Sequence, residues 1–250
     1  MEEEGPLHSF ELHDWIPISM GGLDISINKA VVMMWVVVSL AAVLMVAAGS
    51  ARKLVPGKLQ SIAEMMVDFI RSMILDTMGK DGMRFFPLIA TLFLFILFCN
   101  LLGLIPGSYT VTSQIIVTAV FSCVVYGISL VMGFLLHGFK FLGILVPPGT
   151  PGWLLPLMIP IELMSQLARP ISLAVRLFAN MTAGHVILGV LFGMAISGGL
   201  LIGWLPFAFT VAIYGLEVGI AFIQAYIFTI LTCVYLGDAY HLHGHEEHAH

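Results

Sequence analysis

The chain has 250 residues, of which 59% are hydrophobic and only 10% charged, with a mean hydropathy of +1.02. An average soluble domain carries roughly 25% charged residues, so this composition excludes an ordinary soluble protein and predicts an integral membrane protein. The net charge of -5 indicates no nucleic-acid partner. The three cysteines lie singly inside apolar runs, which is typical of core residues and not of disulfides or metal sites.

The apolar runs are about 20 residues or longer, the length that a membrane-spanning helix needs, and they lack the alternating polarity of barrel strands. We therefore predict a single all-α membrane domain with about five membrane-embedded helices and one amphipathic surface helix. The predicted segments are residues 1–28 (polar, outside), 30–49 (first span), 58–79 (amphipathic helix), 85–105 and 112–136 (membrane hairpin), 155–196 and 200–236 (long hairpin) and 237–250 (polar tail).

Positive charge is concentrated after the first span. Six of the ten Lys and Arg residues lie between Arg52 and Arg84, whereas only Lys29 precedes the span. The positive-inside rule therefore places the N-terminus outside and this loop in the cytoplasm. Within the loop, apolar residues recur at helical spacing over 58–79, so an amphipathic helix either lies on the membrane surface or packs on protein alone.

The last two apolar segments are unusually long. At ~1.5 Å per residue each would extend about 55 to 60 Å, twice the ~30 Å hydrocarbon core, so each must be tilted, kinked or cut. The break at Ser197-Gly198-Gly199 is short and predicts an antiparallel hairpin. Small-xxx-small spacing at Gly189/Gly193 and Gly215/Gly219 predicts close contact between its arms. The His-rich tail at 237–250 is expected to be solvated and cytoplasmic.

Few polar side chains interrupt the long hairpin. They are Glu162, Gln166, Arg169, Arg176, Asn180, His185, Glu217 and Gln224. An ionisable group near the bilayer centre costs at least ~2.5 kcal/mol on insertion scales, which indicates that such groups serve a function. Arg176 gives the clearest indication, because a guanidinium stays protonated at any ordinary pH.

Helical geometry separates these groups. Asn180 lies one turn beyond Arg176 on the same face of the helix. Glu162 points to within about 40° of the direction of Arg176 and lies about 21 Å from it along the helix axis. His185 points to nearly the opposite side, about 13 Å further along, so Arg176 and His185 should not form one compact site. Glu217 and Gln224 share a face on the other arm, and a His185–Glu217 pair across the hairpin would form a proton relay.

Other interpretations of these residues stay open. Glu162 could be a carboxylate that reaches the lipid interface, and Arg169 an interfacial anchor. His185 could be a hydrogen-bonded core residue, and Gln224 could serve only to bond two helices.

The segment Arg169-Pro-Ile-Ser-Leu-Ala-Val-Arg176-Leu-Phe-Ala-Asn180-Met-Thr-Ala-Gly-His185, together with Glu217-Val-Gly-Ile-Ala-Phe-Ile-Gln224, resembles subunit a of F-type ATP synthases. Asn100-Leu-Leu-Gly-Leu-Ile-Pro106 is also similar to that family. The resemblance implies a stator subunit of the membrane Fo sector in a bacterial inner membrane. Its partners would be a rotating c-ring, the peripheral-stalk b subunits, the rest of the synthase and the lipid bilayer.

The resemblance also implies roles for single residues. Arg176 would be the essential charge facing the c-ring, between two offset half-channels, and His185 with Glu217 would serve the outer channel. Glu162 would lie at the inner channel mouth, and Asn180 and Gln224 would line the path or orient Arg176. Ser172 and Asp238 are further candidates for the inner side.

The transported ion is expected to be a proton, and no cofactor or metal is expected. No Gly-rich phosphate loop is present, so ATP chemistry would belong to another subunit and this chain would not be an enzyme by itself. The alternative is a secondary transporter that binds an anionic substrate at Arg176, but the sequence lacks the internal repeat of many such transporters. A purely structural scaffold would leave Arg176, His185 and Glu217 unexplained.

Overall fold

The structure is a computed structural model that describes residues 14–16, 19–20, 23–24, 27–50, 57–105, 111–146 and 151–240. In this part of the chain, five helices are long and apolar enough to cross a membrane, which confirms the predicted all-α membrane class. Two small antiparallel ladders precede them and were not predicted. β1 (Asp14–Ile16) pairs with β4 (Ile27–Asn28), and β2 (Ser19–Met20) pairs with β3 (Leu23–Asp24).

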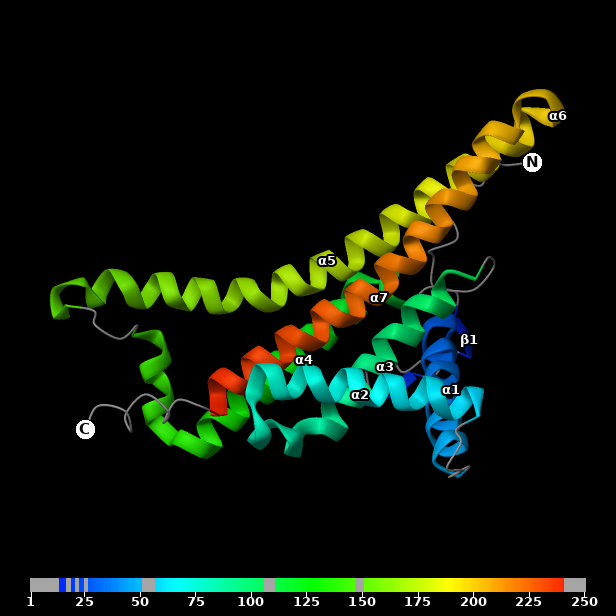
Figure 1. Ribbon diagram of the computed structural model, residues 1–250. Helices are drawn as coiled ribbons and strands as arrows, with labels where there is room; N and C mark the ends of the chain where they lie inside the picture. The colour runs from blue at the N-terminus through cyan, green and yellow to red at the C-terminus, as the bar shows by residue number, and fades with distance from the viewer. Residues whose placement is uncertain are drawn as a thin grey trace.

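Helix α1 (Lys29–Ser50) stands at one end of the bundle and packs on α2 and α3 (Figure 1). Its first turn is capped by Asn28, whose Oδ1 accepts a hydrogen bond from the Val31 N–H at 3.1 Å. Six of its large apolar side chains are exposed, Trp35 at 70% and Val46 at 67% among them. This exposed apolar surface suits contact with lipid or with another membrane protein.

Helix α2 (Lys58–Met78) lies across the bundle (Figure 1) and divides its apolar residues between two faces. Ile70, Ile74 and Met78 are buried, and the helix packs on α3 and α7, whereas Ile62 and Met65 remain exposed. The interpretation that α2 packs on protein therefore holds for its C-terminal half. The helix stops at Gly79, whose φ of 69° is unfavourable for other residues.

The next two helices form the centre of the bundle. After the 3₁₀ segment η2 (Lys80–Phe85), α3 runs over Phe86–Gly103, and after η3 (Val111–Ser113), α4 runs over Ile115–His137. The 3₁₀ segments η4 (Gly138–Leu145) and η5 (Gly152–Leu154) follow. The face of α4 towards α5 and α7 carries small buried residues: Thr118, Ser122, Val125 and Ser129. Small side chains let membrane helices approach closely.

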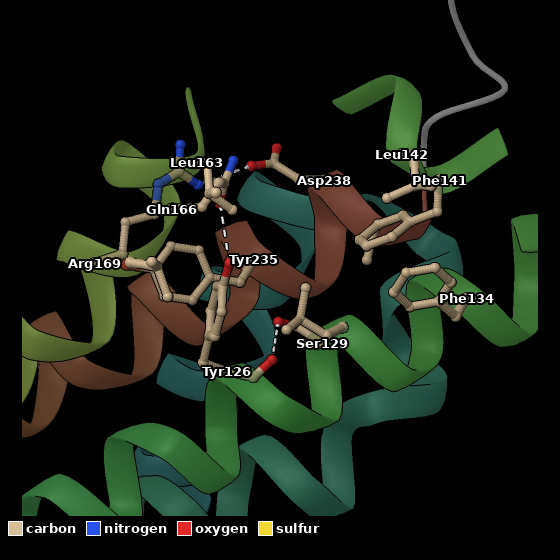
Figure 2. Close-up of a pocket in the computed structure, with 13 residues that line it drawn as sticks. Tyr126, Ser129, Phe134, Phe141, Leu142, Leu163, Gln166, Arg169, Tyr235 and Asp238 are labelled. Atoms are coloured by element: carbon tan, nitrogen blue, oxygen red, sulfur yellow. Dashed lines mark hydrogen bonds and ion pairs between the residues drawn. The ribbon is translucent and has the colours of Figure 1, made fainter. Parts of the chain in front are cut away.

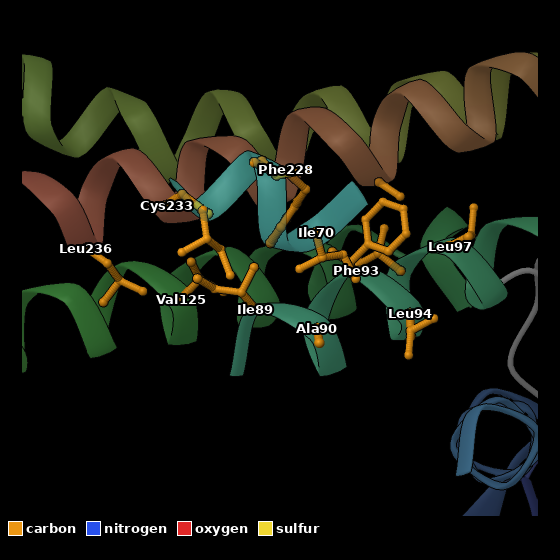
Figure 3. Packing of buried hydrophobic residues seen from close by; sticks show 14 of the residues in the cluster. Ile70, Ile89, Ala90, Phe93, Leu94, Leu97, Val125, Phe228, Cys233 and Leu236 are labelled. Atoms are coloured by element: carbon orange, nitrogen blue, oxygen red, sulfur yellow. The ribbon is translucent and has the colours of Figure 1, made fainter. Parts of the chain in front are cut away.

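The main core joins α2, α3, α4, α5 and α7 (Figure 3). Phe228 of α7 is fully buried, and around it the cluster includes Ile70 of α2, Phe93 of α3 and Leu173 of α5. Cys233 is buried in the same cluster as a free thiol, and Cys99 is also buried, as predicted for core residues. Cys123 is exposed on α4, so the same prediction is wrong for this residue.

The two longest helices are α5 (Leu155–Ser197, 43 residues) and α7 (Trp204–Tyr240, 37 residues). At ~1.5 Å per residue they extend about 65 and 56 Å. They pack against each other and are joined through the short α6 (Gly199–Ile202), which projects beyond the other helices, while their far ends diverge (Figure 1). α7 begins later than predicted, because α6 extends the turn, and it continues through Gly237 and Asp238 to Tyr240.

The predicted contact through paired glycines is wrong. A Cβ built on Gly189, Gly193, Gly215 or Gly219 would meet no atom within 4 Å. The close approaches are at Gly203, where a Cβ would overlap the Ala195 carbonyl, and at Gly184, where it would overlap the Glu217 carboxylate. Glycine spacing identified the helices that pack together but not the residues in contact.

Candidate functional site

Arg176 lies at the border of the exposed face of α5. The buried residues Leu173 and Leu177 hold the other side of the helix in the bundle, whereas Arg176 is exposed together with the small residues Ser172 and Ala179. Within the described residues, the guanidinium makes no hydrogen bond or ion pair. A permanent cation is therefore exposed on the surface of an otherwise apolar helix.

Towards the start of α5, the acidic and amide side chains are linked to each other. The Gln166 Nε2 donates a hydrogen bond to the Glu162 Oε1 at 2.9 Å, and the Tyr126 hydroxyl of α4 donates to the Gln166 Oε1 at 3.4 Å. Glu162 is half-buried and Gln166 is buried. Glu162 is thus part of a hydrogen-bond network that reaches α4.

Arg169 and Asp238 form an ion pair next to this network (Figure 2). The Arg169 Nη1 lies 3.7 Å from the Asp238 Oδ2, and the Arg169 guanidinium lies 5.5 Å from the centre of the Tyr235 ring. The pair borders a cavity of about 190 Å³, whose walls come from α4, η4, α5 and α7. Asp238 was assigned to the polar tail from the sequence. Because α7 continues to Tyr240, Asp238 is instead fixed on a helix.

Glu217 is buried where the two arms of the hairpin meet. Its exposed fraction is 7%, and neither carboxylate oxygen has a hydrogen-bond partner within the described residues. The carboxylate occupies the space beside Gly184, the residue that precedes the half-buried His185. The structure therefore brings Glu217 next to the residue that precedes His185, while the His185–Glu217 pair itself stays a prediction.

Further buried polar atoms lie in the interface of α3, α5 and α7. Among the described residues, the Gln224 Nε2, the Thr182 Oγ1 and both polar side-chain atoms of Asn100 have no protein partner. Asn100 and Gln224 each lie one turn from the cluster of Leu104, Met181 and Ala221. A buried polar group left unsatisfied costs about 1–3 kcal/mol, so this interface is suited to holding water.

The site residues thus fall into an order along the hairpin. Glu217 and His185 are near the α6 end, Glu162 is near the start of α5, and Arg176 with half-buried Asn180 lies between them. No metal-binding group of three or more His, Cys, Asp or Glu occurs in the described parts of the chain. The His-rich residues 241–250 lie outside the described residues.

Sequence reasoning assigned no role to Asn100, Thr182, Gly184, Tyr126 or Tyr235. Asn100 gave a usable signal, because it is an amide inside an otherwise apolar span. The position of Gly184 gave none, since only the packed hairpin shows that Glu217 occupies the space beside it.

Known proteins resemble nearly the whole chain. A family model described as the ATP synthase A chain matches residues 31–237. The ATP synthase subunit a of Rhizobium johnstonii is 50% identical over 246 residues, covering 96% of this chain and 98% of the relative. That of Magnetococcus marinus is 49% identical over 245 residues, covering 95% and 93%, and that of Brucella ovis is 48% identical over 242 residues, covering 94% and 97%. The chain belongs to the ATP synthase A chain family.

Proposed function

We propose that this chain is the proton-translocating stator subunit of a bacterial F-type ATP synthase, in which Arg176 faces the carboxylates of a rotating c-ring. The observation that carries the proposal is the exposure of Arg176 without an ion-pair partner among the described residues. The small exposed residues beside it leave room for a second helix to approach.

Charge explains what Arg176 does there. A ring carboxylate beside the guanidinium is favoured as the anion, so the carboxylate must release its proton before it passes. Arg176 neither accepts another proton nor readily loses its own, and it therefore blocks direct proton leakage between the two sides of the membrane. Each proton that crosses ~100 mV releases about 2.3 kcal/mol, which the ring converts into rotation.

The outer half-channel passes the buried polar groups of α3, α5 and α7. Glu217 and His185 exchange protons with the ring, and Gln224 and Asn100 hold water in the interface. The support for this path is the set of buried polar atoms that lack protein partners within the described residues. Water that satisfies such atoms would form a continuous route for protons.

The inner half-channel opens near Glu162. The Glu162–Gln166–Tyr126 network supports this role, because it supplies polar groups at the start of α5. Asn180 and Ser172 line the side of α5 that carries Arg176. The N-terminus lies outside and the C-terminus in the cytoplasm of a bacterial inner membrane, with protons as the transported ion and no cofactor in this subunit.

Partners and chemistry follow from the same assignment. The exposed apolar surfaces of α1 and α2 are available to lipid and to the peripheral-stalk b subunits. ATP hydrolysis and synthesis take place in other subunits, so this chain is not catalytic by itself.

Removal of the Arg176 charge tests the proposal. In inverted membrane vesicles with the whole synthase, we expect Arg176→Ala to abolish ATP-driven proton pumping, measured by quenching of an acridine dye. Arg176→Lys should also be severely impaired, because it keeps the charge but loses the planar guanidinium. Arg71→Ala, which removes an exposed charge from α2, is the matched control and should pump normally. Normal pumping by Arg176→Ala would overturn the proposal.

A further inference from the structure

The face of α5 that carries Arg176 also carries a second permanent cation. Arg169 precedes Arg176 by seven residues, which is nearly two full turns, so the two side chains differ by only about 20° in direction and about 10.5 Å along the axis. Neither guanidinium is neutralised by losing its proton. A carboxylate that moves past this face therefore meets two cations, although only one of them should hold it.

Only Arg169 is paired within the described part of the chain. Its Nη1 lies 3.7 Å from the Asp238 Oδ2, and its guanidinium lies over the Tyr235 ring (Figure 2). Asp238 of α7 therefore compensates the charge of Arg169, whereas Arg176 has no ion-pair partner within the described residues.

Packing at the end of α7 fixes the position of Asp238. Gly237 lies against α2, where a Cβ on Gly237 would come within 3.4 Å of the Met78 Cγ. The Tyr240 ring lies 5.1 Å from the Arg84 guanidinium and 6.3 Å from the Phe85 ring. The carboxylate is thus held by a packed helix, although its side chain is 49% exposed. A pair between fixed groups loses less conformational entropy than a pair between mobile ones.

We propose that Asp238 neutralises Arg169, so that Arg176 is the one uncompensated cation that this face of α5 offers to a rotor carboxylate. The inference rests on the proposed function and adds a condition to it. Without Asp238, a carboxylate that leaves Arg176 would remain as the anion beside Arg169. Its proton exchange on the inner side, and therefore rotation, would slow.

A double-substitution experiment tests this. ATP-driven pumping is measured in vesicles with the whole synthase, and rates are normalised to the assembled complex on native gels. We expect Asp238→Asn to lower pumping about tenfold, within the range for coupled neighbouring charges. Arg169→Gln should stay within about twofold of the parent, and Arg169→Gln/Asp238→Asn should recover to about the same level, since the unmasked cation is gone.

The controls distinguish neutralisation of Arg169 by Asp238, called masking below, from other roles of Asp238. Asp238→Glu keeps the charge and should pump like the parent, and Asp238→Ser removes the charge in a second way if the Asn variant assembles poorly. If the double variant pumps as slowly as Asp238→Asn, Asp238 carries protons itself and masking is overturned. Normal pumping by Asp238→Asn also overturns masking. In both cases the loss of pumping in Arg176→Ala would leave the proposed function standing.

Discussion

The two arms of the long hairpin have similar composition but opposite environments. In its most apolar stretch, the arm that contains α5 has 11% of its residues buried, whereas the corresponding stretch of α7 has 44% buried. α7 contacts α2, α3, α4 and α5, whereas α5 lies along one side of the bundle with a long exposed face (Figure 1). The difference shows that α7 is a central element of the core, whereas α5 leaves most of its apolar surface uncovered by this chain.

Several polar groups follow the same division, although Gln166 of α5 is buried and Asp238 of α7 is exposed. On α7, Glu217, Gln224 and Thr229 are buried, whereas on α5 Arg176 and Ser172 are exposed. An enclosed acid such as Glu217 can exchange protons through internal water that amides and hydroxyls hold in place, and an exposed charge is accessible to a partner that approaches it. Burial alone therefore separates the enclosed polar groups of α7 from the exposed ones of α5, as the proposed channel and rotor contact require.

Two phenylalanine substitutions, one on each helix, test the difference in burial between α5 and α7. Phe228 of α7 is fully buried in the main cluster, and Phe192 of α5 is 55% exposed. Phe228→Ala should destabilise the chain by roughly 3–5 kcal/mol, because a buried ring leaves a cavity. Phe192→Ala is the matched control and should cost this chain almost nothing.

Thiol labelling measures the difference. Cys233 is buried in the same cluster as Phe228, so a reagent reaches its thiol only when the cluster opens. Mass spectrometry of the Cys233 peptide should show labelling accelerated about 100-fold in Phe228→Ala. The destabilised cluster opens more often, and each opening exposes the Cys233 thiol to the reagent. Equal labelling rates in the two variants would contradict the division between α5 and α7.

Glu217→Gln tests the enclosed groups of α7. The substitution keeps size and polarity but removes proton exchange, so proton flux should fall about 100-fold, the lower range for a lost acid–base group. Assembly should be preserved. Glu64→Gln on α2 is the matched control, because Glu64 is exposed and accepts a hydrogen bond from Gln60 at 2.8 Å. Unaltered flux with normal assembly would remove Glu217 from the path.

The sequence was sufficient for features that depend on composition and local periodicity. The number of long apolar helices followed from the length of the apolar runs, and the separation of Arg176 from His185 followed from ~100° per residue. The predicted end of α7 came too early, because Gly237 and Asp238 were interpreted as the start of a polar tail. In the structure, the packing of Gly237 on α2 continues the helix.

Contacts between helices were beyond the sequence. Four spaced glycines predicted the hairpin contact, yet the contact uses Gly184 and Gly203, since which side of each helix faces the other depends on the whole bundle. Arg169 and Asp238 form an ion pair although they are 69 positions apart (238 − 169 = 69). They lie on two different helices, and no local sequence pattern predicts how these helices are rotated relative to each other.

Gly184→Ala should give the smallest of these effects. Its Cβ would overlap the Glu217 Oε1, so the buried carboxylate must move away from the part of α5 that carries His185. We expect proton flux to fall about tenfold, less than the loss from removing an acid–base group altogether. Gly189→Ala on the same helix is the matched control, since its Cβ would meet nothing within 4 Å, and flux should be unchanged.

A shorter acid distinguishes displacement of Glu217 from a general effect on the helix. In Gly184→Ala/Glu217→Asp, the removed methylene draws the carboxylate back from the added methyl group, so flux should rise above that of Gly184→Ala. Flux is measured in vesicles stripped of their ATP-hydrolysing subunits, which isolates the membrane step. If Gly184→Ala and Gly189→Ala behave alike, the space beside Gly184 does not position Glu217. The enclosed path on α7 would then not depend on its contact with α5.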